Sequence, residues 1–254
     1  MSTPTWTRVD KKEDVLHEMS FLEHLDDLRG VLLHSLVAFL IPSMVCWFFS
    51  GRLVDFLIAD LGGRQLNFFA PSEAFMVRMR ISFVSGLIIA SPYIIYRVWS
   101  FVAPALFSKE RRKVLPVAIA STVLFYTGVV FCYLVLIPVI MHFFLGFGTA
   151  KMKPVISVGA YFTMVARMCF TFGAVFQLPI VVLLLSALGL ITPRLLLNQW
   201  RWAVVLIFVV AAVLTPPDPV SQVFMALPLL LLYIGSVLVA YVVVRKKRTA
   251  SEVE

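Results

Sequence analysis

Residues 30–51 read GVLLHSLVAFLIPSMVCWFFSG, a run that holds no Lys, Arg, Asp or Glu. About 20 consecutive apolar residues are enough for an α-helix to cross a bilayer. The run must be helical, because backbone groups left unpaired in lipid are too costly. The strands of a membrane β-barrel alternate apolar and polar residues, whereas this run is continuously apolar. The stretch therefore predicts a membrane-spanning α-helix.

The whole chain shares this character. Of its 254 residues, 61% are hydrophobic and 14% are charged, and the mean hydropathy is +0.95. Soluble domains are about 45–50% apolar and about 25% charged, so an ordinary soluble globule is not expected. Disorder is excluded because it needs few apolar residues and high charge. We expect an integral membrane protein with little room for a separate soluble domain.

Five more charge-poor runs follow the first and predict further spans, at residues 75–96, 114–150, 161–187, 202–214 and 221–244. The third run is too long for one span, and Pro138, followed by Gly146 and Gly148, predicts that its helix ends near Pro138. Pro179 predicts a kink in the fourth helix. The expected fold is all-α, with six transmembrane helices.

The fifth run is unusually short. From Trp202 to Leu214 a helix rises about 20 Å, whereas the hydrocarbon core is about 30 Å thick. A helix of this length thins the bilayer or buries its ends against protein. The connection Thr215–Val220 to the sixth run is also short. We therefore expect the fifth and sixth helices to form a shallow hairpin.

The positions of Lys and Arg predict the orientation. On one side we expect the N-terminal tail, the connections between the second and third and between the fourth and fifth helices, and the C-terminal tail. These segments hold four, five, two and four Lys and Arg residues, and the other side holds the remaining seven of 22. Positive loops stay in the cytoplasm, so both termini are expected there. The net charge of +8 then reflects membrane orientation and not nucleic-acid binding. The expected division is a cytoplasmic tail over 1–29, a six-helix membrane domain over 30–244 and a cytoplasmic tail over 245–254 that begins with basic residues.

The N-terminal tail contains apolar residues at helical spacing, Phe21, Leu25, Leu28 and Leu32. Glu23, Asp26 and Asp27 fall largely on the remaining face. This pattern predicts an amphipathic helix in the membrane interface that leads into the first span. The acids either simply face water or form a cytoplasmic surface that binds a cationic ligand, and the pattern does not decide between these.

Few polar residues lie inside the predicted spans. Gln177 is midway along the fourth helix, where an amide either bonds to a neighbouring helix or docks a partner helix. Arg78 and Arg80 begin the second span, and Arg167 is near enough to the outer end of the fourth to snorkel. Asp218 is most simply a turn residue.

The segment 99–112, WSFVAPALFSKERR, combines aromatic, turn and charged residues. Trp99 and Phe101 suit the membrane interface. Ser108 is a plausible N-cap for the third helix, and Glu110 would then lie in the first turn, where the helix dipole favours a carboxylate. Arg111 is equally well explained as an orientation signal.

No catalytic or metal-binding motif is present. The three cysteines, Cys46, Cys132 and Cys169, lie inside apolar runs with no CxxC, and HExxH, GxSxG and P-loop patterns are absent. We expect no enzyme activity, cofactor or metal. A small-molecule transporter is disfavoured because repeat symmetry and midplane charges are lacking. An intramembrane enzyme is disfavoured because His34 and His142 have no evident partner at useful spacing.

Four motifs occur in order along the six runs: 21–29 FLEHLDDLR, 70–75 APSEAF, 101–106 FVAPAL followed by ERR, and 214–218 LTPPD followed by Ser221-Gln222. Together they resemble the TatC family, the multi-spanning core subunit of the twin-arginine protein translocase. The resemblance extends from residue 21 to about residue 244, and it implies that the fifth and sixth helices are both short.

The resemblance implies a signal-peptide receptor and scaffold of a Sec-independent translocase. Such proteins bind signal peptides with consecutive arginines on folded passengers and export these passengers with the proton-motive force. The implied partners are single-span TatA-like and TatB-like subunits in an oligomeric complex. The implied location is the bilayer of the bacterial inner membrane, with both termini cytoplasmic.

The resemblance also assigns residues. Asp27 and Glu110 take the positions that face the signal arginines, within a signal-peptide site that also includes Glu23, Arg29, Phe101 and Arg111. The implied contacts with partner helices are Gln177, Thr215, Asp218 and Gln222. The chain departs from the family twice, because Asp27 and Gln177 each stand where the family usually has Glu. Glu23 or Asp26 can share the role of Asp27, and Gln177 cannot ionise.

Overall fold

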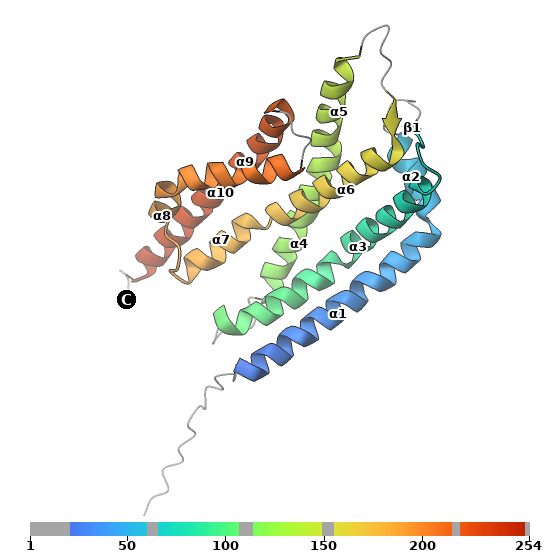
Figure 1. Ribbon diagram of the computed structural model, residues 1–254. Coiled ribbons are helices and arrows are strands. Elements are labelled where there is room, and N and C mark those ends of the chain that lie inside the picture. Colours follow the sequence, from blue (N-terminus) through green and yellow to red (C-terminus); the bar gives the residue numbers. More distant parts are fainter. Residues whose placement is uncertain (1–20, 60–65, 107–113, 149–154, 215–218, 252–254) are drawn as a thin grey trace, which may run out of the picture.

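The computed structural model describes residues 21–59, 66–106, 114–148, 155–214 and 219–251, which are almost entirely helical (Figure 1). The helices are α1 (Phe21–Phe48), α2 (Ser50–Ala59), α3 (Glu73–Leu106), α4 (Val114–Phe131), a π-helical segment (Cys132–Leu136), α5 (Ile137–Gly146), α6 (Val158–Val175), α7 (Leu178–Ala187), α8 (Pro193–Asn198), α9 (Trp200–Leu214) and α10 (Pro219–Ser251). Two short strands, β1 (Leu66–Asn67) and β2 (Ile156–Ser157), pair in parallel.

Six membrane crossings account for these helices. Five stretches are long and apolar enough to cross a bilayer, Leu25–Phe48, Glu73–Val102, Val114–Gly146, Val158–Ala187 and Pro219–Val242, and α9 is a shorter apolar helix. The predicted all-α fold with six spans is confirmed. Successive crossings alternate in direction, so the start of α1 and the end of α10 lie on one side. We call that side the terminal end, and the side with α2, β1 and β2 the strand end (Figure 1).

The third span does not end near Pro138, so that prediction was wrong. Helix α4 continues through the π-helical segment into α5, and the apolar stretch runs from Val114 to Gly146. Proline lacks an N–H and clashes with the preceding turn. Here Pro138 falls in the first turn of α5, and the wider π turn just before it accommodates the ring. The span therefore continues past the proline.

The fourth span is interrupted as expected. Helix α6 ends at Val175 and α7 begins at Leu178, with Pro179 in the first turn of α7. The Gln177 N–H bonds to the Ala174 carbonyl at 3.1 Å, and the Gln177 carbonyl accepts the N–H groups of Ile180 and Val181. The break thus keeps the backbone groups of Gln177 satisfied.

The expectation of short fifth and sixth helices holds for the fifth alone. Helix α9 has 15 residues, about 22 Å, which is below the thickness of the hydrocarbon core. Helix α10 has 33 residues, and its apolar stretch Pro219–Val242 has 24. Only α9 is therefore short in this hairpin. Helix α10 is long, because it continues beyond its apolar stretch through the basic residues from Arg245.

The apolar stripe of the N-terminal motif is continuous with the first span. Helix α1 runs from Phe21 to Phe48 without interruption, so Leu25, Leu28 and Leu32 belong to the same helix as the charge-free run. No separate helix precedes the span within the described residues. Where this first part sits relative to the bilayer interface stays a prediction.

Small residues allow close helix crossings. A Cβ on Gly86 of α3 would lie 2.6 Å from both Cα and N of Ser43 in α1, and a Cβ on Gly128 of α4 would lie 2.7 Å from the Phe172 carbonyl oxygen. Glycine therefore sets how near α1 comes to α3 and α4 comes to α6. Helix α6 also supplies fully buried core residues, Met168 and Phe172 among them. Such contacts hold helices together in lipid, where hydrophobic driving force is weak.

The strand end is tied together by Glu73, the first residue of α3. One oxygen of its carboxylate accepts the Ser157 hydroxyl and the Gly159 N–H, the latter at 2.6 Å. The other accepts the Phe69 N–H at 2.7 Å. Ser157 also caps α6 by accepting the Ala160 N–H. A single carboxylate thus joins the start of α3 to the start of α6 beside the β1–β2 pair.

We predict that Gly86→Ala destabilises the protein by about 1–3 kcal/mol, since the new Cβ meets backbone atoms that cannot move cheaply. Gly235→Ala in α10 is the matched control, because no atom lies within 4 Å of its added Cβ, and it should be neutral or stabilising. Unfolding of the detergent-solubilised protein measures both. Equal stabilities would contradict a close crossing at Gly86.

We also predict that Glu73→Ala lowers the thermal unfolding midpoint and increases proteolysis at the strand end, because three hydrogen-bond donors lose their acceptor. Glu73→Gln should be intermediate, since its amide keeps one acceptor oxygen. An unchanged midpoint and cleavage pattern in Glu73→Ala would show that the carboxylate does not hold the strand end.

Candidate functional site

The predicted signal-peptide residues that the structure describes lie together at the terminal end. Helices α1 and α3 pack side by side in opposite directions, so the beginning of α1 lies beside the end of α3 (Figure 1). Asp27 and Arg29 are exposed on α1, and Phe101 is half-buried on α3. Residues more than 70 positions apart in sequence, such as Asp27 and Phe101, thereby come to the same end of the helices.

The structure describes only one of the remaining predicted signal-peptide residues. Glu23 belongs to the first turn of α1, four positions before Asp27, so both positions share one helix face. Glu110 and Arg111 lie outside the described residues, and α3 ends four positions before Glu110. The structure therefore places Asp27 and the end of α3 at the same end of the helices.

The acids on α1 are available for a ligand. Asp26 and Asp27 are both exposed, and within the described ranges neither forms an ion pair. Two adjacent carboxylates without a basic partner make a local negative site at the terminal end. Such a site attracts a cation.

Gln177 lies in a polar contact between three helices. Its amide donates to the Ser121 carbonyl of α4 at 2.9 Å, and the Trp99 indole of α3 donates to the Ser121 hydroxyl at 2.7 Å. Ser121 is fully buried. The predicted hydrogen bond from Gln177 to a neighbouring helix is confirmed, while contact with a partner helix stays a prediction.

An apolar cavity of about 410 Å³ lies between α3 and α7 beside this contact. Val98 and Val102 of α3 and Val181 and Leu185 of α7 line it, and Gln177 is the polar residue at its wall. Its lining suits an apolar helix face.

The α9–α10 hairpin has its own amide contact. Gln222 of α10 donates to the Phe208 carbonyl of α9 at 2.9 Å. Thr215 and Asp218, predicted to contact partner helices together with Gln222, lie outside the described residues. The structure thus places Gln222 in the first turns of α10, beside a carbonyl in the middle of the short helix α9.

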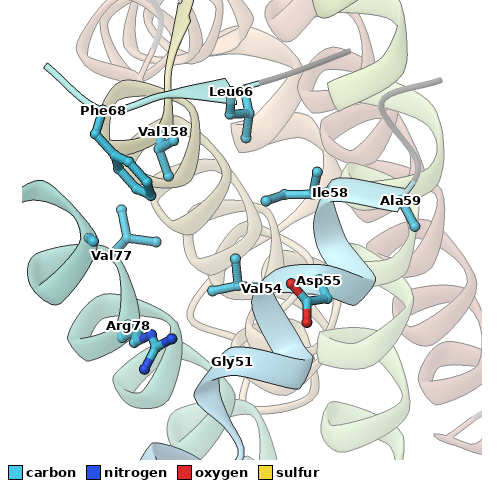
Figure 2. Close-up of a pocket in the computed structure, with 11 residues that line it drawn as sticks. Gly51, Val54, Asp55, Ile58, Ala59, Leu66, Phe68, Val77, Arg78 and Val158 are labelled. Carbon is cyan, nitrogen blue, oxygen red and sulfur yellow. The ribbon is translucent and has the colours of Figure 1, made fainter. Parts of the chain in front are cut away.

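The strand end has cavities that sequence reasoning missed. One of about 690 Å³ lies between α2, β1 and α3, and Figure 2 shows the Asp55 carboxylate and the Arg78 guanidinium on different walls of it.

Glu73 is also a residue whose role the sequence does not reveal, since it stands there only within the motif at 70–75. An acid in the first turn of a helix is favoured by the helix dipole, but the partners of Glu73, Ser157 and Gly159, are more than 80 residues away.

The cysteines match the sequence expectation. Cys46, Cys132 and Cys169 are free and buried. They contribute to packing.

Comparison with known proteins assigns the family. Residues 23–228 match the family model described as Sec-independent protein translocase protein (TatC). A protein of that name from Aquifex aeolicus is 36% identical over 91% of this chain and 98% of its own. The chloroplastic TATC of Pisum sativum is 38% identical over 86% of this chain and 63% of its own.

A solved structure agrees in fold. The crystal structure titled "Twin Arginine Translocase Receptor- TatC" has a TM-score of 0.81 and 36% identity, and the match covers 87% of this chain and 99% of that one. The family is a component of a protein translocase and not an enzyme. With six membrane crossings, four motifs in order and a match over most of its length, this chain is a multi-pass membrane protein that belongs to the TatC family of Sec-independent protein translocases.

Proposed function

We propose that this protein is the signal-peptide receptor and scaffold of a translocase that exports folded proteins bearing twin-arginine signal peptides. The observation that carries the proposal is the antiparallel packing of α1 and α3, which brings the exposed acids of α1 to the end where α3 leads into the segment with Glu110. Family membership supplies the transport role. The proposed binding set is Asp27, Glu110, Glu23, Arg29, Phe101 and Arg111.

The preference for arginine follows from hydrogen-bond geometry. A guanidinium presents two parallel N–H groups that match the two oxygens of a carboxylate, and an ammonium cannot copy this fork. Asp27 is one methylene shorter than the usual glutamate. Asp26, which is adjacent and also exposed, is placed to share the contact. Two acidic positions, one on α1 and one after α3, then favour two consecutive arginines.

The terminal end is proposed to face the cytoplasm of a bacterial cell, with the protein in the inner membrane. The uneven distribution of Lys and Arg supports this orientation, and six crossings put both termini on the same side. No nucleotide-binding motif is present in the sequence, which is consistent with the proton-motive force as the energy source.

Single-span TatA-like and TatB-like subunits are the proposed partners within an oligomeric complex. The apolar cavity suits the side of one transmembrane helix, and Gln177 is one of the residues that line it. Gln222, with Thr215 and Asp218, is the second proposed contact. Helix α9 is shorter than the hydrocarbon core is thick, so the bilayer beside it should be thinned.

Asp27→Asn is expected to weaken binding of an Arg-Arg signal peptide by about 10-fold, as expected for the loss of a charge-assisted hydrogen bond. Fluorescence binding in nanodiscs measures this, with a Lys-Lys peptide as the reference ligand. Asp55→Asn is the matched control, since Asp55 is also exposed but lies on α2 at the strand end. Equal binding of both peptides, unaffected by Asp27→Asn, would overturn the proposed site.

Glu110→Ala should also lower the preference for Arg-Arg over Lys-Lys. If Asp27 and Glu110 both contact the arginine pair, the variant that combines Asp27→Asn with Glu110→Ala should show almost no preference for the Arg-Arg peptide.

Gln177→Leu should reduce crosslinking of a single-span partner to α7, because Gln177 lines the cavity and the hydrogen bond from its amide to the Ser121 carbonyl holds this wall in place. Ser121→Ala is the control for general loosening of the helices, as it removes the hydroxyl that Trp99 uses while Ser121 itself is buried away from the cavity. Unchanged crosslinking in Gln177→Leu, or an equal loss in Ser121→Ala, would remove Gln177 from the partner contact.

A further inference from the structure

Two arginines from different transmembrane helices line one cavity at the strand end. The cavity has a volume of about 730 Å³, and Arg80 of α3 and Arg167 of α6 both belong to its wall. Apolar side chains form much of the rest, including Met141 and Phe144 of α5 and Leu214 of α9. The cavity therefore combines two positive charges with a surface suited to hydrocarbon.

Both arginines come from helices that run away from the strand end, since α3 starts at Glu73 and α6 starts at Val158. Side chains on a helix tilt towards its N-terminus. Arg80 and Arg167 lie about 10 Å and about 14 Å along their helices from those starts. Snorkelling would bring their guanidinium groups from within the spans to the phosphate level of the nearer leaflet.

Neither guanidinium has a carboxylate partner within the described part of the chain. Arg80 donates to the Thr163 hydroxyl, which in turn donates to the Gly159 carbonyl at 2.5 Å. A guanidinium has five N–H donors, so the Thr163 bond leaves Arg80 with others. Charged side chains in a membrane span are costly and mark functional sites. Two such cations on one cavity call for an anion.

The acid in the same cavity does not supply that anion. Glu73 also lines it, but both of its oxygens already accept hydrogen bonds from Ser157, Phe69 and Gly159. The formal charge of the lining is therefore positive. The neighbouring cavity differs, because Asp55 balances Arg78 on its walls (Figure 2).

We propose that this cavity binds an anionic phospholipid of the phosphatidylglycerol type, taken from the leaflet at the strand end. Its phosphodiester lies between Arg80 and Arg167, and an acyl chain lies against Met141, Phe144 and Leu214. A phosphodiester offers the oxygens that a guanidinium fork pairs with. A soluble anion would leave the apolar wall uncovered. The bound lipid would bridge α3 and α6 to the end of the short helix α9.

The test uses the full-length protein, purified and delipidated in detergent. Native mass spectrometry follows titration with phosphatidylglycerol and, separately, with phosphatidylethanolamine of identical chains. Phosphatidylglycerol should bind more tightly, and Arg80→Gln and Arg167→Gln should each weaken its binding by about 10-fold. Glycerol 3-phosphate at millimolar concentration should not compete, because it lacks acyl chains.

Arg78→Gln is the matched control, since Arg78 lies two positions from Arg80 on the same helix but lines the other cavity. It should leave phosphatidylglycerol binding unchanged. Arg80→Lys and Arg167→Lys keep the charge and should retain part of the affinity. The rise in unfolding midpoint on adding phosphatidylglycerol, compared for each variant with its own lipid-free midpoint, separates lost binding from lost folding.

Equal binding of the two lipids would overturn the proposed selectivity for an anionic headgroup. Binding that survives Arg80→Gln combined with Arg167→Gln, or falls equally in Arg78→Gln, would overturn the site. Competition by glycerol 3-phosphate would show a site for a soluble phosphate instead of a lipid.

Discussion

The absence of water from the bilayer core is the constraint on which the rest of this structure depends. Every backbone N–H and C=O in that region needs a partner within the protein, and helices supply it locally. Hydroxyl groups follow the same rule, as Ser43 and Thr122 each donate to the carbonyl four positions earlier. Pro138 and Pro179 do not break it either, because the π-helical segment before Pro138 and the turn before Pro179 keep the surrounding backbone bonded.

Once the helices are formed, their approach is decided by shape. Lipid is as apolar as leucine, so burial of apolar surface contributes little to helix association, and close contact and interhelical hydrogen bonds take its place. Gly86 against Ser43 and Gly128 against Phe172 illustrate the first. Ser121, which accepts from both Trp99 and Gln177, illustrates the second. These contacts hold α3, α4, α6 and α7 together around the buried face of α6.

The same rules make the two ends chemically different. The terminal end carries exposed acids on α1 beside the end of α3, which suits a cationic peptide. The strand end carries a glutamate engaged in capping and arginines that line cavities, which suits an anion. The proposed peptide site and the proposed lipid site thus lie at opposite ends of the helices.

The sequence by itself determined the all-α fold, the six spans, the short fifth helix and the break near Pro179, because each depends on the length of an apolar run or on one proline. It also carried the motifs of the TatC family. It did not determine that the third span continues past Pro138, since a π-helical segment absorbs the proline through neighbouring turns. Only the tertiary structure decided that Glu73 meets Ser157 and Gly159, that Gln177 meets Ser121, and that Arg80 and Arg167 share a cavity. These residues are far apart in the chain, and their proximity depends on how the helices cross, which local patterns do not encode.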